Sequence, residues 1–411
     1  MKILIASSSI SLQGGVPSYN KELCNLLKKS NEVHLLVEQD IDSYPGFNKV
    51  IPIPSLDLAS SESSRILLEE INAENYDVII NSNSHVISLL APYLTNQTNL
   101  IGTSHSLRYT ESDTAAFNAE FVDTVIALSG YNKLYLDRKF GLGNKCIVVP
   151  NFVSDKSDAV VLREKKKNNK VLSIVYVGGG APTKTPELVV KVLRGLLKTG
   201  LNFKFTWLGL NTPPLKKIQP FQDMCCLLPE DSRIDYRGRV PSDEAAKVIE
   251  NANIFFSPSR REGCPMSLLE AMSVGCIPIS ADFEIANKEI IKNGENGFII
   301  SHKRPDLFVE KISDIINNHD KYLSVYDEAY ETFTGTLNYE AWFNRMNEVL
   351  STKELKHVKR LEAFDSRQYA EDLKLFNKID KRNRRHMMLN ETIPSAWSCF
   401  LLYLSYHRKT I

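Results

Sequence analysis

The sequence predicts an α/β protein with two doubly wound parallel sheets facing a central cleft, followed by a helical extension at the carboxyl end. The chain has 411 residues, more than one hydrophobic core usually serves, since domains run to about 100–200 residues. Short apolar runs of strand length alternate with stretches of helical spacing, a pattern typical of parallel sheets covered on both faces. This alternation stops near residues 150–170 and then begins again, which indicates two domains.

The first series of strands begins close to the amino terminus. Ile3–Ala6 is an apolar run too short for the core of a signal peptide, so we interpret it as a buried strand. The loop at Gly14-Gly15 follows, and then a helix is predicted from the spacing of Tyr19 and Leu23. Further strands are predicted at Val33–Val37, Asp77–Ile80, Leu100–Thr103, Val125–Leu128 and Ile147–Val149.

A charged stretch, Arg163–Lys170, separates the two series, and we interpret it as a solvated surface or linker. The pattern restarts with a strand at Val171–Val177, a glycine loop and a helix over Glu187–Lys198. Further strands are predicted at Phe203–Leu208, Ile234–Tyr236, Ile254–Ser257, Cys276–Ile279 and Gly297–Ile300. In such an architecture a ligand binds where the strands end, in the cleft between the domains.

The predicted boundaries are residues 1–160 for the first domain and 171–335 for the second. Trp342, Met346 and Leu350 are spaced four apart, which predicts an amphipathic helix within about 336–352. Residues 353–411 form a separate basic helical tail.

Composition excludes several classes of protein. Lys plus Arg is 50 and Asp plus Glu is 49, so the net charge of +1 argues against a general nucleic-acid binder. The apolar runs are shorter than the roughly 20 residues that a membrane span needs. Seven cysteines without a Cys-x-x-Cys pair indicate reduced thiols in a cytoplasmic protein.

The tail differs from the rest of the chain in charge. Residues 353–411 carry a net charge of +6, and the remaining chain carries −5. The basic cluster Lys381–Arg385 precedes the aromatic stretch Ala396–Tyr406. Two interpretations follow: residues 378–406 contact an anionic membrane surface, or they pack as a helix on the protein body or in an oligomer.

The densest chemical signal lies between Ser257 and Gly275. A strand ends there, Pro265 suits the first position of a helix, and Gly275 suits its end. The amides of Cys264, Met266 and Ser267 then lack helical partners and form an anion site suited to a diphosphate.

Two carboxylates lie on either side of this anion site. Glu262 precedes the predicted helix and Glu270 lies in its second turn. Carboxylates repel phosphate, so we expect them to accept hydrogen bonds from hydroxyl groups, such as those of a sugar and a ribose. The alternative is a surface helix with two solvated glutamates.

This stretch resembles the E-x7-E motif of family 4 glycosyltransferases, which are retaining enzymes with the GT-B fold of two Rossmann-like domains. The resemblance covers roughly residues 1–350, and this motif is its most specific part. Other segments match in order: Gly14-Gly15, Thr103–Ser106, Asp123–Ser129, Pro150–Val153 and Tyr176–Gly179 leading to Lys184.

The resemblance implies a role for each matching position of the second domain. Glu262 holds hydroxyls of the donor sugar, and Glu270 holds the ribose. Lys184 neutralises the departing diphosphate. The remaining donor-binding positions are Gly178, Gly179, Cys264, Met266, Ser267 and Leu268.

In the first domain the resemblance implies two further positions. Gly15 brings the backbone close to phosphate or acceptor, which a residue without a side chain permits. His105 faces the reacting carbon and hydrogen-bonds the donor sugar. The implied catalytic residues are therefore His105, Glu262 and Lys184.

One position departs from the family pattern. Gly179 stands where the family commonly has an arginine that pairs with the lysine on the diphosphate. Arg237, Arg239, Arg260 and Arg261 are candidates to replace it. A catalytically weak accessory or scaffold protein that binds nucleotide sugar or glycan without turnover is therefore the alternative function.

Two other motifs carry less weight. Gly178–Thr185 nearly spells a phosphate-binding P-loop, but Thr183 stands where that motif needs glycine. Asp40-Ile41-Asp42 matches the DxD of metal-dependent transferases, and we interpret it as a loop.

The resemblance implies a retaining enzyme that moves a sugar from a nucleotide sugar, expected to be a UDP-sugar. The expected acceptor is a saccharide or glycolipid in cell-surface polysaccharide or glycoconjugate synthesis. We expect neither a metal nor another cofactor, and no nucleic-acid partner. The expected location is the cytoplasm, peripheral to the inner face of the plasma membrane.

Overall fold

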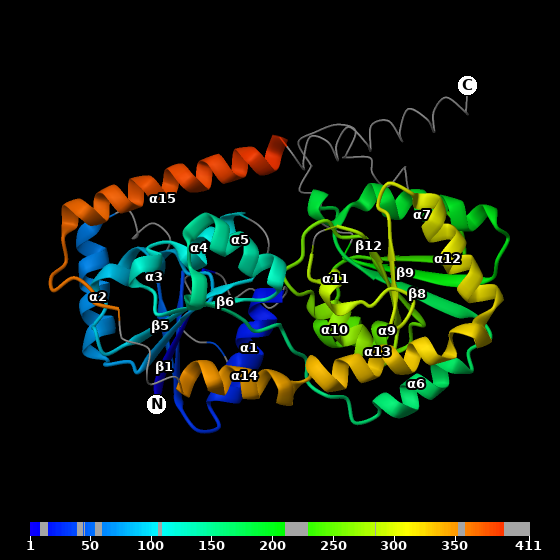
Figure 1. Ribbon diagram of the computed structural model, residues 1–411, viewed down its shortest axis with the longest axis horizontal. Helices are drawn as coiled ribbons and strands as arrows, with labels where there is room; N and C mark the ends of the chain where they lie inside the picture. Colours follow the sequence, from blue (N-terminus) through cyan, green and yellow to red (C-terminus); the bar gives the residue numbers. More distant parts are fainter. Residues whose placement is uncertain are drawn as a thin grey trace. The chain divides into compact units, whose positions relative to one another are not determined.

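The computed structural model describes residues 1–8, 15–38, 44, 46–53, 60–105, 109–209, 229–283, 285–351 and 358–389 (Figure 1). The chain divides into two compact units. Unit 1 comprises Met1–Asn151 and Phe343–Arg384, and unit 2 comprises Phe152–Trp342 and Arg385–Ile411.

Unit 1 is built on a seven-stranded parallel sheet with the order β3-β2-β1-β4-β5-β6-β7. Its strands are β1 (Lys2–Ser7), β2 (Glu32–Val37), β3 (Lys49–Pro52), β4 (Val78–Asn81), β5 (Asn99–Ser104), β6 (Thr124–Ala127) and β7 (Cys146–Val148). The sequence prediction missed β3. This strand lies at the edge and buries one of its four residues, so it lacks the continuous apolar run of the central strands.

The helices of unit 1 begin where polar side chains can satisfy their first amides. They are α1 (Gly15–Leu27), α2 (Ser61–Ala73), α3 (His85–Leu90), α4 (Tyr109–Ala116) and α5 (Gly130–Phe140). The hydroxyl groups of Ser60, Ser84 and Ser129 accept hydrogen bonds from amides in the first turns of α2, α3 and α5. At the other end of α5, Gly141 takes the left-handed conformation that stops a helix.

Unit 2 is built on a six-stranded parallel sheet with the order β10-β9-β8-β11-β12-β13. Its strands are β8 (Leu172–Val177), β9 (Phe203–Leu208), β10 (Ile234–Arg237), β11 (Ile254–Ser257), β12 (Ile277–Ala281) and β13 (Phe298–Ile300). Its helices include α6 (Ala159–Lys167), α7 (Pro186–Lys198), α9 (Ser242–Glu250), α10 (Met266–Met272), α11 (Asn287–Ile290), α12 (Pro305–Asn317) and α13 (Leu323–Thr336). The predicted class of two doubly wound sheets is confirmed.

The interpretation of Arg163–Lys170 as a solvated surface holds for most of its side chains, but it fails for Lys166, and the stretch is helical where a linker was the other possibility. Most of this stretch belongs to α6, and Lys166 is buried. Its Nζ donates to the carbonyl oxygens of Glu250 at 2.6 Å and Val274 at 2.9 Å. Burial lowers the pKa of Lys166. The carbonyl groups that accept hydrogen bonds from Lys166 are far away in the sequence. The run of charged residues therefore could not indicate that Lys166 is buried.

The strand order of each sheet reverses next to its first strand. In unit 1 the chain departs to opposite sides of β1, so β2 and β4 flank it, and in unit 2 β9 and β11 flank β8. Ligands of doubly wound folds bind at such points, beyond the carboxyl ends of the strands. A ligand is therefore expected to bind beside the residues just after β1, β4, β8 and β11.

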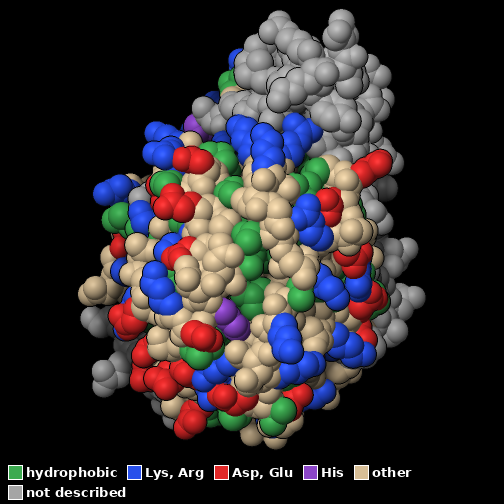
Figure 2. All heavy atoms as spheres, turned by 90° about the vertical axis from the view of Figure 1, so that its right-hand side faces the viewer, with side chains coloured by type: hydrophobic (Ala, Val, Ile, Leu, Met, Phe, Trp, Pro, Cys, Tyr) green, Lys and Arg blue, Asp and Glu red, His purple; other side chains and the backbone are tan. Residues whose placement is uncertain are grey.

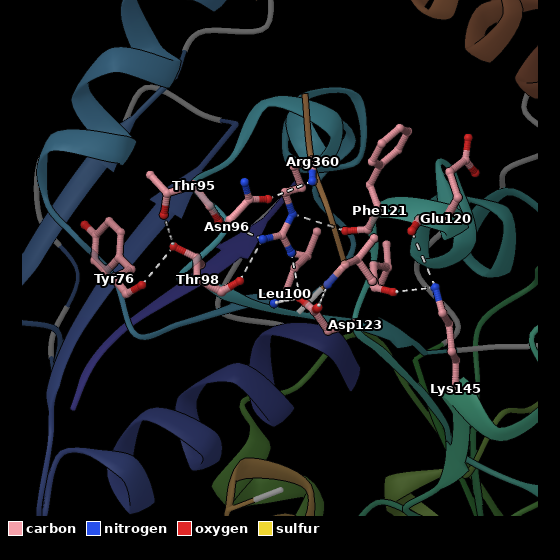
Figure 3. Close-up of polar contacts among 12 residues, drawn as sticks. Tyr76, Thr95, Asn96, Thr98, Leu100, Glu120, Phe121, Asp123, Lys145 and Arg360 are labelled. Atoms are coloured by element: carbon pink, nitrogen blue, oxygen red, sulfur yellow. Dashed lines mark hydrogen bonds and ion pairs between the residues drawn. The ribbon is translucent and has the colours of Figure 1, made fainter. Parts of the chain in front are cut away.

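The chain leaves unit 2 and enters unit 1 within α14 (Tyr339–Ser351). It is then fastened to unit 1 by the fully buried side chain of Arg360 (Figure 3). The guanidinium donates to Asp123 Oδ2 at 2.6 Å and to three carbonyl oxygens, those of Thr95 at 2.7 Å, Thr98 at 2.8 Å and Phe121 at 3.3 Å. Asp123 also accepts from the amide of Leu100 at 2.8 Å.

The last described helix, α15 (Ser366–Met387), lies along unit 1 (Figure 1). Ser64 of α2 donates to the Tyr369 hydroxyl at 2.7 Å, and Asn383 donates to Asp113 of α4 at 2.6 Å. Between these bonds, Phe376 packs on His85 with ring centroids 5.2 Å apart. In the described part of the predicted segment 378–406, the contact of Asn383 thus confirms packing on the protein body. The stretch Ala396–Tyr406 lies outside the described residues.

No helix within the described parts of the chain is long and apolar enough to cross a membrane.

Candidate active site

The loop that follows β8 in unit 2 requires glycine for its own packing. The Gly178 amide donates to Leu208 O at 2.9 Å, and Trp207 Nε1 donates to Gly178 O at 2.7 Å. A Cβ atom at Gly178 would lie 2.3 Å from the Tyr176 hydroxyl. At Gly179 it would lie 3.1 Å from the carbonyl oxygen of Gly209. At Gly178 the side chain of Tyr176 on the same strand thus leaves no room for a Cβ atom, and at Gly179 the backbone after β9 leaves little.

The loops after β8 and β11 are tied together by backbone contacts. The Arg260 amide donates to Thr183 O at 2.8 Å, and Thr185 Oγ1 donates to Pro258 O at 2.5 Å. The Tyr176 hydroxyl donates to Lys184 O at 2.9 Å. These bonds hold the backbone of Lys184 close to the segment that carries Glu262.

Lys184 and Glu262 form an ion pair with Nζ and Oε1 2.5 Å apart. Their side chains are 29% and 15% exposed, so solvent and a ligand can reach them. The sequence assigned these residues to two different parts of a donor molecule, and the structure brings them together. In the free protein the two charges neutralise each other. A ligand with an anionic group and hydroxyl groups could bind Lys184 with the first and Glu262 with the second.

The helix α10 begins at Met266, one residue after the predicted start at Pro265, with Glu262 before it and Glu270 within it. The amide of Leu268 donates to Pro265 O at 3.1 Å, and the Leu268 side chain is fully buried. Leu268 thus contributes to the helix and the core, and its contact with a donor stays a prediction. Among the described residues, the amides of Met266 and Ser267 have no acceptor, which fits the predicted anion site.

Cys264, also predicted to bind the donor, is buried in the loop before α10. Glu270 is partly buried, and its carboxylate has no hydrogen-bond donor among the described residues. Burial raises the pKa of Glu270, and the positive charge of Lys156 opposes this shift. A carboxylate in this environment gains from hydroxyl donors, because they replace the water it has lost.

Arg260 is one of the four arginines that the sequence offers in place of the one missing at Gly179. Its guanidinium lies over the Phe283 ring, 5.4 Å from the centroid, and 4.0 Å from Glu187. Its Nε is buried without a hydrogen-bond partner. By contrast, Arg237 is paired with Asp235 at 2.7 Å and approaches Glu244 at 3.4 Å.

In unit 1, His105 follows β5. It contacts Ser82, which follows the neighbouring strand β4. Its Nε2 lies 2.6 Å from Ser82 Oγ, and Ser82 Oγ lies 2.6 Å from Asn20 Oδ1. The Tyr19 ring meets the imidazole edge-on at 4.9 Å. Burial lowers the pKa of His105 to about 3, so the ring is neutral at physiological pH.

Sequence reasoning missed Ser82 and Asn20, which orient His105. The available signal was the polar run Asn81–Ser84 directly after an apolar strand, at the edge where ligands bind. Gly15 begins α1, and a Cβ atom there would meet nothing within 4 Å. Within the described residues, the chain itself thus gives no reason for glycine at position 15.

Asp40-Ile41-Asp42 lies outside the described residues. In the described part of the chain, no three His, Cys, Asp or Glu side chains gather as a metal site would require.

Two Rossmann-like units, each with polar groups beyond its central strands, place the protein in the structural class of GT-B transferases. Comparison with known families bears this out. Residues 13–157 match the family described as Glycosyltransferase Family 4, and residues 160–332 match Glycosyl transferases group 1. The chain belongs to this glycosyltransferase family.

Individual relatives are more distant. An uncharacterized glycosyltransferase of Methanocaldococcus jannaschii is 29% identical over 198 residues, 48% of this chain and 51% of the relative. A lipopolysaccharide 1,6-galactosyltransferase of Salmonella typhimurium is 35% identical over 82 residues, 20% of this chain and 23% of the relative. The chain thus matches about half the length, or less, of these curated relatives.

Among solved structures, HepE of Anabaena in complex with UDP-glucose has a TM-score of 0.69 at 16% identity, covering 86% of this chain and all of HepE. Sucrose-phosphate synthase of Thermosynechococcus elongatus has a TM-score of 0.66 at 18% identity, covering 85% and 98%. At these identities the likeness establishes the fold.

Proposed function

We propose that the protein transfers a sugar from a nucleotide sugar to a hydroxyl group of a saccharide or lipid-linked acceptor, with retention at the anomeric carbon. The pairing of Lys184 with Glu262, beside the amides of Met266 and Ser267, carries this proposal. A cation and two amides suit a diphosphate, and a neighbouring carboxylate suits the hydroxyls of the attached sugar. Together these groups match the two halves of a nucleotide sugar.

The donor in this proposal is a UDP-sugar. HepE, which shares the fold, has been solved with UDP-glucose and with UDP. When the donor binds, its diphosphate takes Lys184 from Glu262. Glu262 then accepts hydrogen bonds from sugar hydroxyls, and Glu270 accepts from the ribose.

Departure of the diphosphate is the step that most needs stabilisation. Lys184 and the Met266 and Ser267 amides meet the developing negative charge, and Arg260 supplies the second cation that Gly179 cannot. Removing one preorganised donor of this kind typically costs about 10²–10³-fold in rate. The departing diphosphate in turn takes the proton of the attacking acceptor hydroxyl, on the same face of the sugar. Because protein groups carry the charge, no metal is needed.

His105 contributes as a neutral hydrogen-bonding group. Its low pKa keeps it uncharged at physiological pH, so it can bind a sugar hydroxyl without attracting the diphosphate. Ser82 and Asn20 fix the plane of the ring.

The acceptor belongs to cell-surface polysaccharide or glycoconjugate synthesis, and the protein works in the cytoplasm at the inner face of the plasma membrane. Four buried cysteines in the described residues, Cys24, Cys146, Cys264 and Cys276, are free thiols, in keeping with a reducing compartment. The similarity to a protein named lipopolysaccharide 1,6-galactosyltransferase supports the choice of acceptor.

The competing function is a scaffold that binds the nucleotide sugar without turnover, which the glycine at position 179 favours. Purified protein is incubated with a panel of nucleotide sugars, with and without candidate acceptors, and nucleotide release is measured. Slow release from one donor, which persists in a chelator and is lost in Lys184→Gln, supports the enzyme. Tight binding without release from any donor supports the scaffold, and restoration by magnesium or manganese after chelation contradicts metal independence.

A further inference from the structure

The exposed side of α15 carries a row of cations that the proposed reaction does not use. It consists of Arg367, Lys374, Lys378, Lys381 and Arg382, and we call it the α15 cation row. At about 100° per residue these positions share one side of the helix, within a sector of about 100°. All five side chains are exposed, and none has an ion pair among the described residues.

The opposite side of α15 is fixed to unit 1. Tyr369, Phe376 and Asn383 contact α2, α3 and α4, and Arg360 anchors the chain just before the helix. The α15 cation row is therefore held in place and faces away from the sheet of unit 1. It lies beyond residues 13–332, the part of the chain that the family matches cover.

This arrangement does not serve the stability of the helix. Lys374 with Lys378, and Lys378 with Arg382, are like charges four residues apart, which destabilises a helix. The exposed Glu371 offsets part of this charge on the same side, while Asp380 is already paired with Arg384. Because these like charges repel one another, binding of an external anion accounts for them better than a role in stabilising the fold does.

We propose that α15 docks unit 1 on a membrane surface of anionic lipid headgroups. The row runs from Arg367 to Arg382, so the helix presents its cations along a line of about 22 Å, which suits a flat surface. Leu375, 50% exposed, lies beside the row and suits the boundary between headgroups and acyl chains. The apolar side of α15 is covered by unit 1, so attachment is electrostatic, without deep insertion of this helix.

A lipid surface fits better than a nucleic acid. The net charge of the whole chain is only +1, and on the face drawn in Figure 2 positive and negative side chains are interspersed. A polyanion that wraps a protein needs a continuous positive field, whereas a planar surface needs one positive edge. Docking would bring unit 1, the acceptor-side unit, to a lipid-linked acceptor. This purpose rests on the proposed function, whereas the docking itself does not.

The test is co-sedimentation of the full chain with vesicles of phosphatidylcholine, alone or with about one third phosphatidylglycerol. Three proteins are compared: the wild type, a row variant and a matched control. The row variant carries Lys374→Gln, Lys378→Gln, Lys381→Gln and Arg382→Gln. The control loses four exposed lysines of unit 2 through Lys170→Gln, Lys191→Gln, Lys198→Gln and Lys204→Gln. Circular dichroism melting verifies that both variants fold.

The wild type is expected to bind the anionic vesicles at low salt, to lose binding at about 0.3 M salt, and to ignore neutral vesicles. Each cation near such a surface contributes about fivefold in affinity. The row variant should therefore bind at least tenfold more weakly, and the control within about twofold of the wild type.

Equal losses in both variants, or no binding by the wild type, would overturn the proposal. So would equally tight binding of a DNA duplex at the same salt, which would assign the row to nucleic acid. Vesicle binding requires no turnover, and release of nucleotide from a soluble donor requires no membrane. The docking proposal and the proposed activity can thus fail separately.

Discussion

Two ion pairs, one in each unit, have the same charges but differ in exposure and in the number of their other partners. Arg360 and Asp123 in unit 1 are 0% and 1% exposed, whereas Lys184 and Glu262 in unit 2 are 29% and 15% exposed. The unit 1 pair is saturated with further partners, including three carbonyl oxygens and two backbone amides. For Lys184 and Glu262, the ion pair is the side-chain contact that the described residues provide.

The difference teaches how to tell a structural pair from a binding pair. A buried pair with every donor and acceptor satisfied has nothing left to offer a ligand, and removing one partner exposes the full cost of burying the other. A pair at the carboxyl edge of a sheet, with accessible and unsatisfied groups, can exchange partners. Arg360 therefore fits a role in stability, and the exposed pair fits the donor-binding role proposed for Lys184.

The largest expected effect is on stability. Arg360→Met leaves Asp123 as a buried charge without its cation, and we expect the free energy of unfolding to fall by about 3–5 kcal/mol. Chemical denaturation followed by circular dichroism measures it. The double variant Arg360→Met, Asp123→Leu should recover part of the loss, because it leaves no unpaired charge. A loss below 1 kcal/mol in the single variant would mean that this pair does not hold the carboxyl-terminal segment.

The second largest effect is expected for Lys184→Gln, which should lower turnover strongly and change stability little. Lys184→Gln is expected to reduce turnover by about 10²–10³-fold, since it removes charge from the departing diphosphate. Its free energy of unfolding should change by no more than about 1 kcal/mol, because the pair is partly exposed. Steady-state kinetics and denaturation of the same preparation measure both. A stability loss as large as that of Arg360→Met would erase the distinction between the pairs.

The pH dependence of stability should distinguish His105 from both ion pairs. The pKa of His105 is about 3 in the folded chain and about 6.5 when unfolded, so the unfolded state binds more protons in between. The free energy of unfolding therefore falls as pH drops below about 6.5, and by pH 5 the loss is about 2 kcal/mol. His105→Gln should remove this part of the pH dependence. Parallel pH profiles for wild type and variant would contradict a histidine that the fold keeps neutral.

Glu270→Gln should weaken nucleotide binding and stabilise the protein slightly. The lost hydrogen bond to the ribose costs about 1–3 kcal/mol of binding. The folded-state pKa of Glu270 is raised, so its ionised form destabilises the fold near neutral pH. Gln removes that charge, and the gain in stability, about 1 kcal/mol or less, should vanish below the ordinary pKa of glutamate. Calorimetric titration with UDP and melting at two pH values measure both; a stability loss at neutral pH would contradict the assignment.

Much of the fold could be predicted from sequence because central parallel strands are continuous apolar runs. Val33–Val37 and Phe203–Leu208 were predicted almost to the residue. The edge strand β3 lacks that signature, and the burial of Lys166 depends on carbonyl groups 84 and 108 residues away.

For the candidate site, the sequence named residues, and their role as a donor site stays a prediction; it did not show which of them contact each other. Glu262 and Lys184 could be found from local motifs, but 78 residues separate them, so their pairing is a property of the fold. Likewise, Asp123 could be marked as part of a family segment, whereas its partner Arg360 comes from a segment 237 residues further on. Ser82 was missed because a serine after a strand carries no signal of the histidine it will contact.

The central claim is that a diphosphate takes Lys184 away from Glu262, and calorimetric titration with UDP tests it directly. Lys184→Gln should weaken UDP binding at least tenfold, because it removes a charged contact. Glu262→Gln should leave UDP binding unchanged or tighten it, because Lys184 no longer has to be released from a carboxylate. Equal weakening by both substitutions would contradict the account, since it would mean that the pair acts as one fixed unit.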